Sequence, residues 1–444
     1  MNGIDILDFH KVGKNGKVYD IIDKKMADYI TSQNNIMIVE GKPYIYKDGV
    51  YAEDDDGLLL KTFIKTMMVE EIVTITKINR VYNLIMSDYR LVRSIDEVNN
   101  YPSHWINFKN GFLDVKTMQM NAHSPFYLAI NQIPHNFDIN RTVPADSVVN
   151  EFLQGVIKDP DDLQMLLAYI GYCMTKDTQQ QKFLVISGTG GTGKSTIIRL
   201  IEKAVGTANI SNISLQDLNE RFRPTCLFGK LLNSCADISS KAMEQVDVIK
   251  KITGEDIIMG EYKGGAVFFF RSYAKLLFSA NEIPVSLDDK TDAFFRRLLI
   301  LRIDKRCHTI ANLEERLTAA VDDFIFMAVQ ALRAMYERGG ILESVNSKKS
   351  ALELQKNSDS VAAFIDDMLV PRADSAIKKG SLLDEYVKYC TYNGRKALGR
   401  NSFYNALENK GFSDGKTSGI GVFRGWAYKE EDFQPLQGYN PYTD

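Results

Sequence analysis

The sequence lacks the patterns of a metal-binding or disulfide framework. Its five cysteines are scattered, and no two lie within three residues of each other, so there is no CxxC pair and a zinc ribbon is not expected. The five histidines show no HxxxH spacing, so no metal site built from histidines is expected either. We predict isolated thiols in a reducing compartment, at Cys173, Cys226, Cys235, Cys307 and Cys390.

Long hydrophobic runs are also missing. The longest, such as Phe183 to Ile186 and Val267 to Phe270, are far shorter than the roughly 20 residues that span a membrane. The N-terminal residues carry neither the basic flank nor the apolar core of a secretory signal. These features predict a cytoplasmic protein, in a bacterial or host cell, with no membrane partner.

Positive charge is not in excess. The chain has 54 lysine and arginine residues against 57 aspartate and glutamate residues, a formal net charge of −3. A protein coated in basic surface is therefore excluded, and any contact with nucleic acid must come from a local patch. With 45% hydrophobic and 25% charged residues, the 444-residue chain has an ordinary globular composition and room for several domains.

Apolar periodicity divides the chain into four zones without internal repeats. Residues 1–145 form a mixed N-terminal domain, with a β-hairpin expected around Asp48-Gly49 and a helix from Leu58 to Met68. Residues 146–345 begin with helical patterns, after which short apolar strands alternate with helices and predict an α/β sheet. Residues 346–370 are polar and are predicted to be a linker, and residues 371–444 form a small C-terminal domain.

The strongest motif is a glycine-rich stretch that matches GxxxxGK[ST] between an apolar strand and a helical pattern. Glycines let the backbone curl so that its N–H groups point at phosphate oxygens, and the helix N-terminus favours negative charge. Lys194 is predicted to reach the phosphates of ATP, and Ser195 to bind Mg²⁺. The expected nucleotide contacts are Gly188, Thr189, Gly190, Gly191, Thr192, Gly193, Lys194, Ser195 and Thr196.

Two later apolar strands end in polar residues. The run that starts at Leu231 ends in Asp237, and the run that starts at Lys275 ends in Asn281. A carboxylate at a strand end can hold Mg²⁺ through water, so Asp237 is predicted to assist Ser195. The amide of Asn281 is predicted to orient the attacking water.

Two basic features accompany these strands. Gly264-Gly265 joins two β-prone runs and predicts a hairpin with Lys263 at its tip, either for contact with phosphates or as an ordinary surface hairpin. Arg296 and Arg297 precede another apolar strand. An arginine that reaches a neighbouring subunit's nucleotide raises the rate by about 10³ to 10⁵ in the best cases, whereas a surface salt bridge is the alternative reading.

The order of these motifs resembles that of a superfamily 3 helicase, and more closely the helicase part of the phage, plasmid and poxvirus-type primase-helicases. Upstream, Asn107 to Asp114 and His123 to Pro125 are similar to the module that precedes the ATPase in that family. Arg221-Phe222 and Leu227 to Lys230 resemble the lead-in to the family's acidic strand. The resemblance implies an AAA+-like P-loop core, a hexameric ring with ATP sites between subunits, and 3′-to-5′ movement.

The resemblance also implies residue roles. Asp237 is the Mg²⁺ acid, Lys263 the DNA-contacting lysine, Asn281 the sensor and Arg297 the finger, with Arg296 as the alternative. Two departures matter. Many relatives have adjacent acids where this chain has Ala236 before the aspartate, so the catalytic base is open, with Glu282 as one candidate. About 145 N-terminal residues without a cluster of metal-binding acids leave no room for a primase, and we expect no primase activity.

The C-terminal zone is basic. Residues 372–430 contain eleven Lys/Arg and six Asp/Glu, a local net charge of +5. Two helical patterns and a glycine-rich hairpin follow in order, which is the order of a winged-helix DNA-binding domain; a basic domain that only packs on its neighbours is the alternative. The predicted DNA contacts are Arg395, Lys396, Arg400, Asn401 and Lys416.

Together these patterns predict an ATP hydrolase that acts as a replicative DNA helicase of a phage or mobile genetic element and translocates on single-stranded DNA. Its expected cofactors are ATP and Mg²⁺. The expected partners are single-stranded, forked or duplex DNA, further copies of the chain, and separate primase or replication proteins. A DNA-binding initiator that uses ATP only as an assembly switch is the main rival. A P-loop kinase is a weaker one, because a kinase needs an acceptor pocket and a lid instead of the hairpin and paired arginines.

Overall fold

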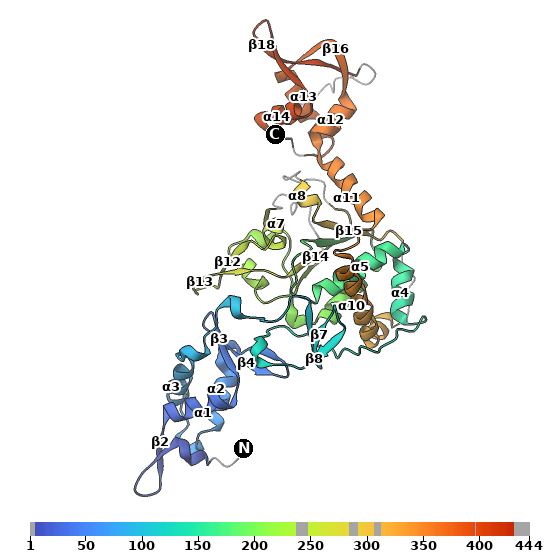
Figure 1. The fold of residues 1–444 in the computed structure, drawn as a ribbon. Helices are drawn as coiled ribbons and strands as arrows, with labels where there is room; N and C mark the ends of the chain where they lie inside the picture. Colours follow the sequence, from blue (N-terminus) through green and yellow to red (C-terminus); the bar gives the residue numbers. More distant parts are fainter. Residues whose placement is uncertain (1–4, 237–246, 284–291, 306–311, 396, 430–444) are drawn as a thin grey trace. The chain divides into compact units, whose positions relative to one another are not determined.

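The computed structural model describes residues 5–236, 247–283, 292–305, 312–395 and 397–429 (Figure 1). Its internal contacts divide the chain into two compact units. The first contains residues 1–238, 247–282 and 297–347, and the second contains residues 239–246, 283–296 and 348–444. No helix within the described ranges combines the length and the apolar character needed to cross a bilayer.

The first unit begins with a small helical lobe. Its buried residues, among them Met26, Ile30, Leu60, Ile64 and Val81, form one apolar cluster. The helix predicted to start at Leu58 is confirmed, and it ends at Thr66. Its buried residues Leu60 and Ile64 are four positions apart and therefore lie on one face. The elements are β1 (His10–Val12), β2 (Val18–Ile21), α1 (Asp23–Gln33), α2 (Leu58–Thr66) and α3 (Ile75–Met86), with β1 and β2 antiparallel.

Two three-stranded antiparallel sheets follow in the same unit. They are β3 (Ile36–Val39), β4 (Lys42–Lys47) and β5 (Val50–Glu53), and then β6 (Trp105–Phe108), β7 (Gly111–Asp114) and β8 (Gln119–Asn121). The hairpin predicted at Asp48-Gly49 joins β4 to β5. Asn107 is buried and donates to the carbonyls of Gly49 and Asn131, while His123 Nε2 lies 3.0 Å from Asn107 Oδ1. The motif at Asn107 and His123 therefore ties the two sheets together.

A five-stranded parallel sheet forms the centre of the first unit. Its strand order is β10-β11-β14-β9-β15, and all pairs are parallel. The strands are β9 (Phe183–Ser187), β10 (Ile210–Ser211), β11 (Leu232–Cys235), β14 (Lys275–Ala280) and β15 (Leu298–Arg302). The strands β9, β14 and β15 are buried on both faces and consist largely of apolar residues, which is why the sequence predicted a mixed α/β fold correctly.

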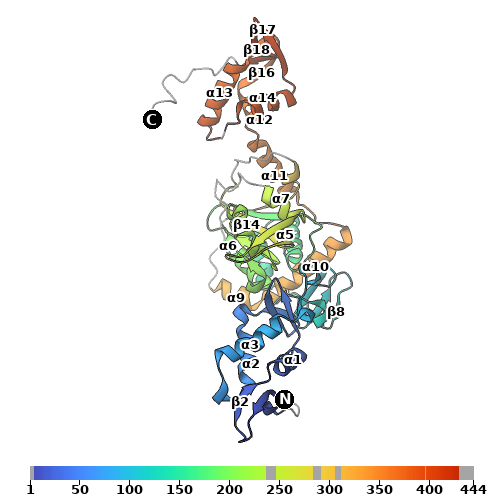
Figure 2. The same cartoon turned by 90° about the vertical axis from the view of Figure 1, so that its left-hand side faces the viewer.

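Helices cover this sheet and complete its core. Leu184 and Ile186 of β9 and Leu277 of β14 share one apolar cluster with the helices α4, α5, α6, α9 and α10. Their bounds are α4 (Val148–Val156), α5 (Pro160–Cys173), α6 (Lys194–Val205), α9 (Leu313–Ala319) and α10 (Val321–Arg338). In Figures 1 and 2, α5 and α10 lie side by side. The carboxyl ends of β9, β11 and β14 meet at one edge of the sheet, where polar residues from distant segments can gather.

The hairpin predicted around Gly264-Gly265 is confirmed. Strands β12 (Ile257–Glu261) and β13 (Val267–Arg271) pair antiparallel, and the Gly265 N–H donates to the Tyr262 carbonyl across the turn. Gly264 has a φ of 77°, a conformation that favours glycine, so the Gly-Gly pair suits this turn. Helix α7 (Asp247–Thr253) precedes the hairpin. Short 3-10 helices lie elsewhere, at Ile6–Phe9, Asp55–Gly57, Glu70–Ile72, Tyr89–Leu91, Ile95–Glu97, Pro125–Tyr127, Thr207–Asn209, Asp217–Asn219 and Pro224–Leu227.

The segment predicted as a linker, residues 346–370, is regular structure instead. It contains most of α11 (Val345–Ser358), all of α12 (Ser360–Met368) and the start of a strand. Val361 and Phe364 of α12 are fully buried in the apolar cluster of the second unit. The polar composition of residues 346–360 hid α11, and the apolar side chains of α12 gain their partners only in the folded unit.

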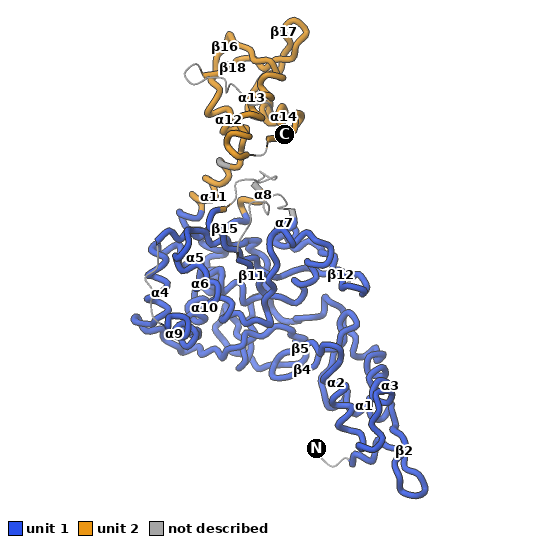
Figure 3. Tube along the Cα trace, turned by 180° about the vertical axis from the view of Figure 1, so that it is seen from behind, with its two compact units in different colours: residues 1–238, 247–282, 297–347 blue, residues 239–246, 283–296, 348–444 orange. Residues whose placement is uncertain are grey.

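The C-terminal part of the second unit, which Figure 3 draws in orange, combines helices with a small sheet. Helix α12 is followed by β16 (Leu369–Lys378), α13 (Lys379–Tyr392), α14 (Arg400–Asn409), β17 (Ser413–Thr417) and β18 (Ile420–Tyr428). The three strands form one sheet in the order β16-β18-β17. Tyr386 and Phe403 stack at 4.1 Å between ring centroids and join α13 to α14. The two helices and the hairpin predicted here are confirmed, with α12 and β16 added in front of them. The helix α8 (Asp292–Phe295) is also assigned to this unit.

Candidate functional site

The glycine-rich loop connects β9 to α6 at the carboxyl edge of the parallel sheet. Gly188 has a φ of +145°, and a Cβ there would lie 1.9 Å from the Ile303 carbonyl oxygen, so the loop needs glycine at its start. Gly191 and Gly193 also have positive φ, and a Cβ on Gly190 or Gly191 would meet nothing within 4 Å. Among the described residues, no backbone hydrogen bond is formed by the N–H groups of Thr189, Gly190, Gly191 and Gly193, while Gly190 and Gly191 form a turn. The loop thus presents free donors to open space in front of a helix N-terminus.

Lys194 lies at the centre of this loop. Its Nζ donates to the carbonyls of Gly188, at 2.5 Å, and Thr189, at 2.8 Å. The same ammonium lies 3.3 Å from Oδ1 of Asn281, which follows β14. The fold therefore brings the loop lysine next to the amide that follows the neighbouring strand β14, a contact that the sequence did not predict. Ser195 is exposed in the first turn of α6, and Thr192 is buried and donates to the Thr189 carbonyl.

The strand predicted to end in an acid is β11, and the structure describes the chain after it only as far as residue 236. Asp237, the predicted Mg²⁺ acid, lies outside the described residues, while Ala236 before it is exposed. Ser234 of β11 donates to Glu202 Oε1 on α6 over 2.7 Å, an acid that the sequence did not single out. Within the described part of the chain, no three His, Cys, Asp or Glu side chains are grouped as a metal site would require. Glu282, the candidate base, is exposed directly after Asn281.

The two paired arginines differ in exposure. Arg297 is only 7% exposed; its carbonyl accepts from the Phe183 N–H at 2.9 Å, and its Nη2 lies 3.3 Å from Gln181 Oε1. Arg296 is exposed. A finger must present its guanidinium at the surface of its subunit. In the isolated subunit Arg296 presents its side chain more openly than Arg297, which packs beside β9, and the choice between the two as the finger stays a prediction.

The tip of the hairpin is exposed at Lys263, and the two residues before it, Glu261 and Tyr262, are held by contacts from other segments. Arg221 makes two hydrogen bonds with the Glu261 carboxylate, at 2.7 and 2.8 Å. On the other side, Tyr262 stacks on Phe268 at 5.3 Å, and the Lys42 ammonium lies 4.3 Å from the centre of the Tyr262 ring. Burial raises the pKa of Tyr262, so its phenol stays protonated. Sequence patterns did not indicate the Lys42 contact, because the two residues are far apart in the chain.

The predicted DNA contacts of the second unit fall into two groups. Arg400 and Asn401 are exposed in the first turn of α14, and Lys416 is exposed on β17. Arg395 is half-buried, and its Nη1 is enclosed without a hydrogen-bond partner in the described part of the chain, so it is less suited to a phosphate contact. Lys396 lies outside the described residues.

Two family models match the chain. "D5 N terminal like" matches residues 23–161, and a family of unknown function, DUF5906, matches residues 186–297, which include the glycine-rich loop, the hairpin and Arg297. The first thus covers the sheets around Asn107, and the second covers most of the central parallel sheet.

Two curated relatives match parts of the chain. A protein of Acanthamoeba polyphaga mimivirus, named as a candidate helicase, is 23% identical over 333 residues, which are 68% of this chain and 34% of that protein. This chain therefore spans about a third of the mimivirus protein's length. An uncharacterized mitochondrial protein of Marchantia polymorpha, ymf21, is 30% identical over 125 residues, which are 26% of this chain and 69% of that protein.

Solved structures share the fold. Two apo structures of the NrS-1 C-terminal region superpose with TM-scores of 0.54 and 0.51 at 12% identity. They cover 90% of this chain and 97% and 98% of the compared chains. At this identity the likeness shows the fold alone. The match to the Marchantia protein shows that the two chains belong to one family. The D5-type model and the mimivirus relative make the chain similar to viral primase-helicase-like proteins.

Proposed function

We propose that this protein is an ATP-driven DNA helicase that works as a homo-oligomeric ring, most simply a hexamer, in the replication of a phage or mobile genetic element. The contact between Lys194 and Asn281 carries the proposal. It joins a phosphate-type loop and a polar strand end on adjacent parallel strands, the arrangement that an AAA+-like P-loop ATPase requires. The strand order, with β9 between β14 and β15, supports the same class.

The loop fits a nucleotide triphosphate with Mg²⁺. The backbone N–H groups of Gly190, Gly191 and Gly193 can bind phosphate oxygens, and the open space before Gly190 and Gly191 lets phosphates approach the backbone. Lys194 Nζ, now shared between carbonyls and Asn281, can turn to a phosphate with little movement. Ser195 and Asp237 would hold Mg²⁺, and the remaining loop residues, with Thr196, would contact the nucleotide.

In this proposal each residue does one task. ATP with Mg²⁺ supplies the phosphoanhydride bond and neutralises its charge. Lys194 holds the phosphates, Asn281 orients water, and Arg296 of one subunit contacts the site of the next. Arg297, buried beside Gln181, positions the start of β15 and so the exposed arginine before it.

Two elements are proposed to contact DNA. The β12–β13 hairpin carries Lys263 at its exposed tip. The contacts of Glu261 with Arg221 and of Tyr262 with Lys42 hold this tip in place, so that a DNA phosphate bound by Lys263 contacts a fixed part of the fold. The order α12, β16, α13, α14, β17, β18 supports a winged-helix fold for the C-terminal unit. Arg400 and Asn401 at the start of α14 and Lys416 on the β17–β18 wing are then the groove and backbone contacts.

Strand displacement on forked DNA with ATP tests the proposal. ATP-dependent unwinding by the native chain, absent from the Lys194→Ala variant, is the expected result. The DNA-binding initiator stays the second candidate because Ala236 stands where relatives carry a further acid, which would slow hydrolysis. ATP-dependent assembly on duplex DNA without unwinding would favour that candidate and exclude the helicase.

A further inference from the structure

The β1–β2 hairpin of the N-terminal lobe carries a concentration of positive charge that the proposed function does not use. Residues 9–19 contain Lys11, Lys14 and Lys17 and no acidic residue, in a chain whose net charge is −3. All three lysines are exposed. The turn between the strands is ordered by hydrogen bonds from the Gly13 N–H to the Lys17 carbonyl and from the Gly16 N–H to the Gly13 carbonyl, both at 2.9 Å.

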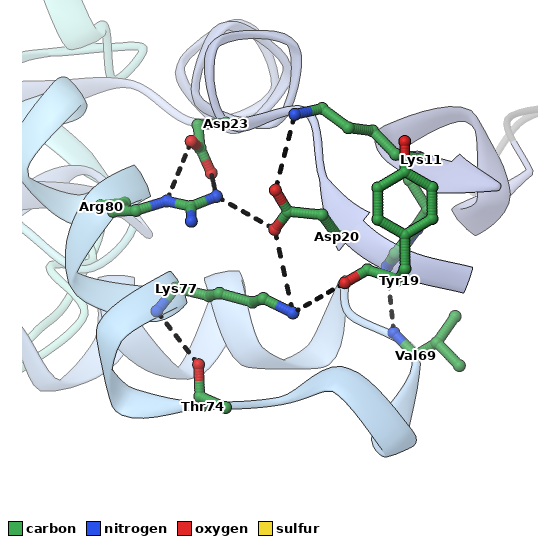
Figure 4. Close-up of polar contacts among 9 residues, drawn as sticks. Lys11, Tyr19, Asp20, Asp23, Val69, Thr74, Lys77 and Arg80 are labelled. Carbon is green, nitrogen blue, oxygen red and sulfur yellow. Dashed lines mark hydrogen bonds and ion pairs between the residues drawn. The ribbon is translucent and has the colours of Figure 1, made fainter. Parts of the chain in front are cut away.

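The nearest acids are already shared among several cations. Asp20 lies 3.5 Å from Lys11, 3.8 Å from Lys77 and 3.2 Å from Arg80, and Arg80 also binds Asp23 at 2.8 Å (Figure 4). Three cations therefore face two carboxylates, which leaves this base of the hairpin with an excess positive charge. The backbone N–H of Ile21 and Arg80 hold the pKa of Asp20 low, so these pairs persist at neutral pH.

Other acids of the lobe lie at the wrong end to neutralise the turn. Glu70 and Glu71 follow Val69, whose N–H donates to His10 Nε2 at 3.1 Å. His10 pairs with Ile21 at the base of the hairpin, whereas Lys14 and Lys17 lie at its turn. The turn therefore presents unneutralised positive charge.

An aromatic side chain is exposed beside this charge. The ladder pairs Lys11 with Asp20 and Val12 with Val18, so Tyr19 falls at a bulge between the two pairs. A bulge redirects a side chain away from the regular alternation, and Tyr19 is 61% exposed. Val12, on the partner strand, is 48% exposed. Proteins that bind single-stranded nucleic acid combine lysines, which contact the phosphates, with exposed aromatic rings, on which unpaired bases stack.

We propose that the β1–β2 hairpin is a binding surface for single-stranded nucleic acid, with Lys14 and Lys17 on phosphates and Tyr19 stacked on a base. It goes beyond the proposed function, because it needs neither ATP nor the contacts at Lys263 and Arg400. An acidic peptide would satisfy the lysines but would leave Tyr19 without a partner.

Photocrosslinking of the full-length chain to a bromouridine-substituted DNA 20-mer, without nucleotide, tests the site. Trypsin releases Tyr19 in the peptide Val18 to Lys24. A crosslink in that peptide is expected, with its yield reduced at least about 5-fold in Tyr19→Leu and retained in Tyr19→Phe. Crosslinks confined to other peptides would overturn the proposal.

Salt titration of DNA binding provides the second readout. The Lys14→Ala/Lys17→Ala variant should lower the slope of log K against log salt by about 1.4, since each charge on a single strand contributes about 0.7. The matched control, Lys47→Ala/Lys65→Ala, removes two exposed lysines of the same unit and should leave the slope unchanged. Equal slopes for both variants would refute the site. Displacement of the bound DNA by a glutamate 20-mer as readily as by an unlabelled DNA 20-mer would refute it as well.

The ATPase activity separates this site from the proposed function. The Lys194→Ala variant is expected to lose ATP hydrolysis and to keep the crosslink. A native chain that lacks ATPase activity but still crosslinks would reject only the proposed function.

Discussion

Lys194 Nζ lies 3.3 Å from Asn281 Oδ1, within hydrogen-bonding distance. Lys194 begins the helix after β9, and Asn281 follows β14, the strand that pairs in parallel with β9. Parallel strands bring their carboxyl ends to one edge of the sheet, so two residues from distant segments meet where phosphates would bind. The contact gives the predictions at this site a definite geometry.

Replacing Lys194 with alanine should abolish ATP turnover and leave the fold intact. Loss of a charge that stabilises the reacting phosphates lowers the rate by about 10²-fold or more. The readout is phosphate release, with circular dichroism as the check on folding. Lys203→Ala, an exposed lysine near the other end of the same helix, is the matched control and should keep turnover. Unchanged hydrolysis in Lys194→Ala would rule out this loop as the nucleotide site.

Gly188→Ala should destabilise the first unit, whereas Gly190→Ala should not. A Cβ at residue 188 would lie 1.9 Å from the Ile303 carbonyl oxygen at a φ of +145°, and a Cβ at residue 190 would meet nothing within 4 Å. Backbone strain of this kind costs about 1–3 kcal/mol before the clash is added. Urea unfolding of both variants measures the difference. Equal midpoints would show that the loop relaxes away from Ile303.

The Lys263→Ala variant should retain basal ATP hydrolysis and lose its stimulation by DNA. The lysine is exposed at the hairpin tip, and the proposal gives it a DNA contact but no contact with the nucleotide. ATPase assays with and without single-stranded DNA give the comparison. Lys251→Ala, an exposed lysine on α7, serves as the control. Full stimulation in Lys263→Ala would assign the hairpin to another role.

Truncation after Ser358 should weaken duplex binding more than self-association. A cut near residue 370 would instead leave α12 behind and expose Val361 and Phe364, because α12 belongs to the core of the second unit. Gel-shift and sedimentation measurements on the shortened chain separate the two effects. The Arg400→Ala/Asn401→Ala variant should reproduce the loss of duplex binding in the full chain. Equal duplex affinity in both would contradict the winged-helix proposal.

Stability of the first unit should rise as the pH increases from about 8 to 10.5. Burial lowers the pKa of Lys275 from 10.5 to about 8, and its Nζ donates to the carbonyls of Thr175, at 2.5 Å, and Tyr273, at 3.0 Å. Below pH 8 Lys275 is charged in both states, and burying the charge lowers the free energy of unfolding by its full amount. Between pH 8 and 10.5 the lysine is neutral in the folded state but still protonated in the unfolded state, so the free energy of unfolding rises with pH.

The expected gain is at most on the order of 3 kcal/mol. Subtracting the pH profile of Lys275→Met from that of the native protein isolates this contribution. A difference that does not vary between pH 7 and 10.5 would show that the ammonium is not desolvated in the folded protein.

Local patterns were sufficient for the elements that depend on near neighbours. The glycine loop before a helix, the Asp48-Gly49 and Gly264-Gly265 turns and the apolar parallel strands follow from backbone freedom, turn chemistry and burial on both faces, which a short window of sequence contains. The helices α13 and α14 of the C-terminal unit followed from their apolar periodicity for the same reason.

Only the tertiary structure decided which distant residues meet. The burial of Arg297, the support of Tyr262 by Lys42, the place of α12 in the second core and the bulge that exposes Tyr19 all depend on packing between segments far apart in the chain. Sequence spacing determines which residues can lie on one face of an element. The partner that covers this face is set by the fold, because burial and pairing free energies are gained only when both segments are in place.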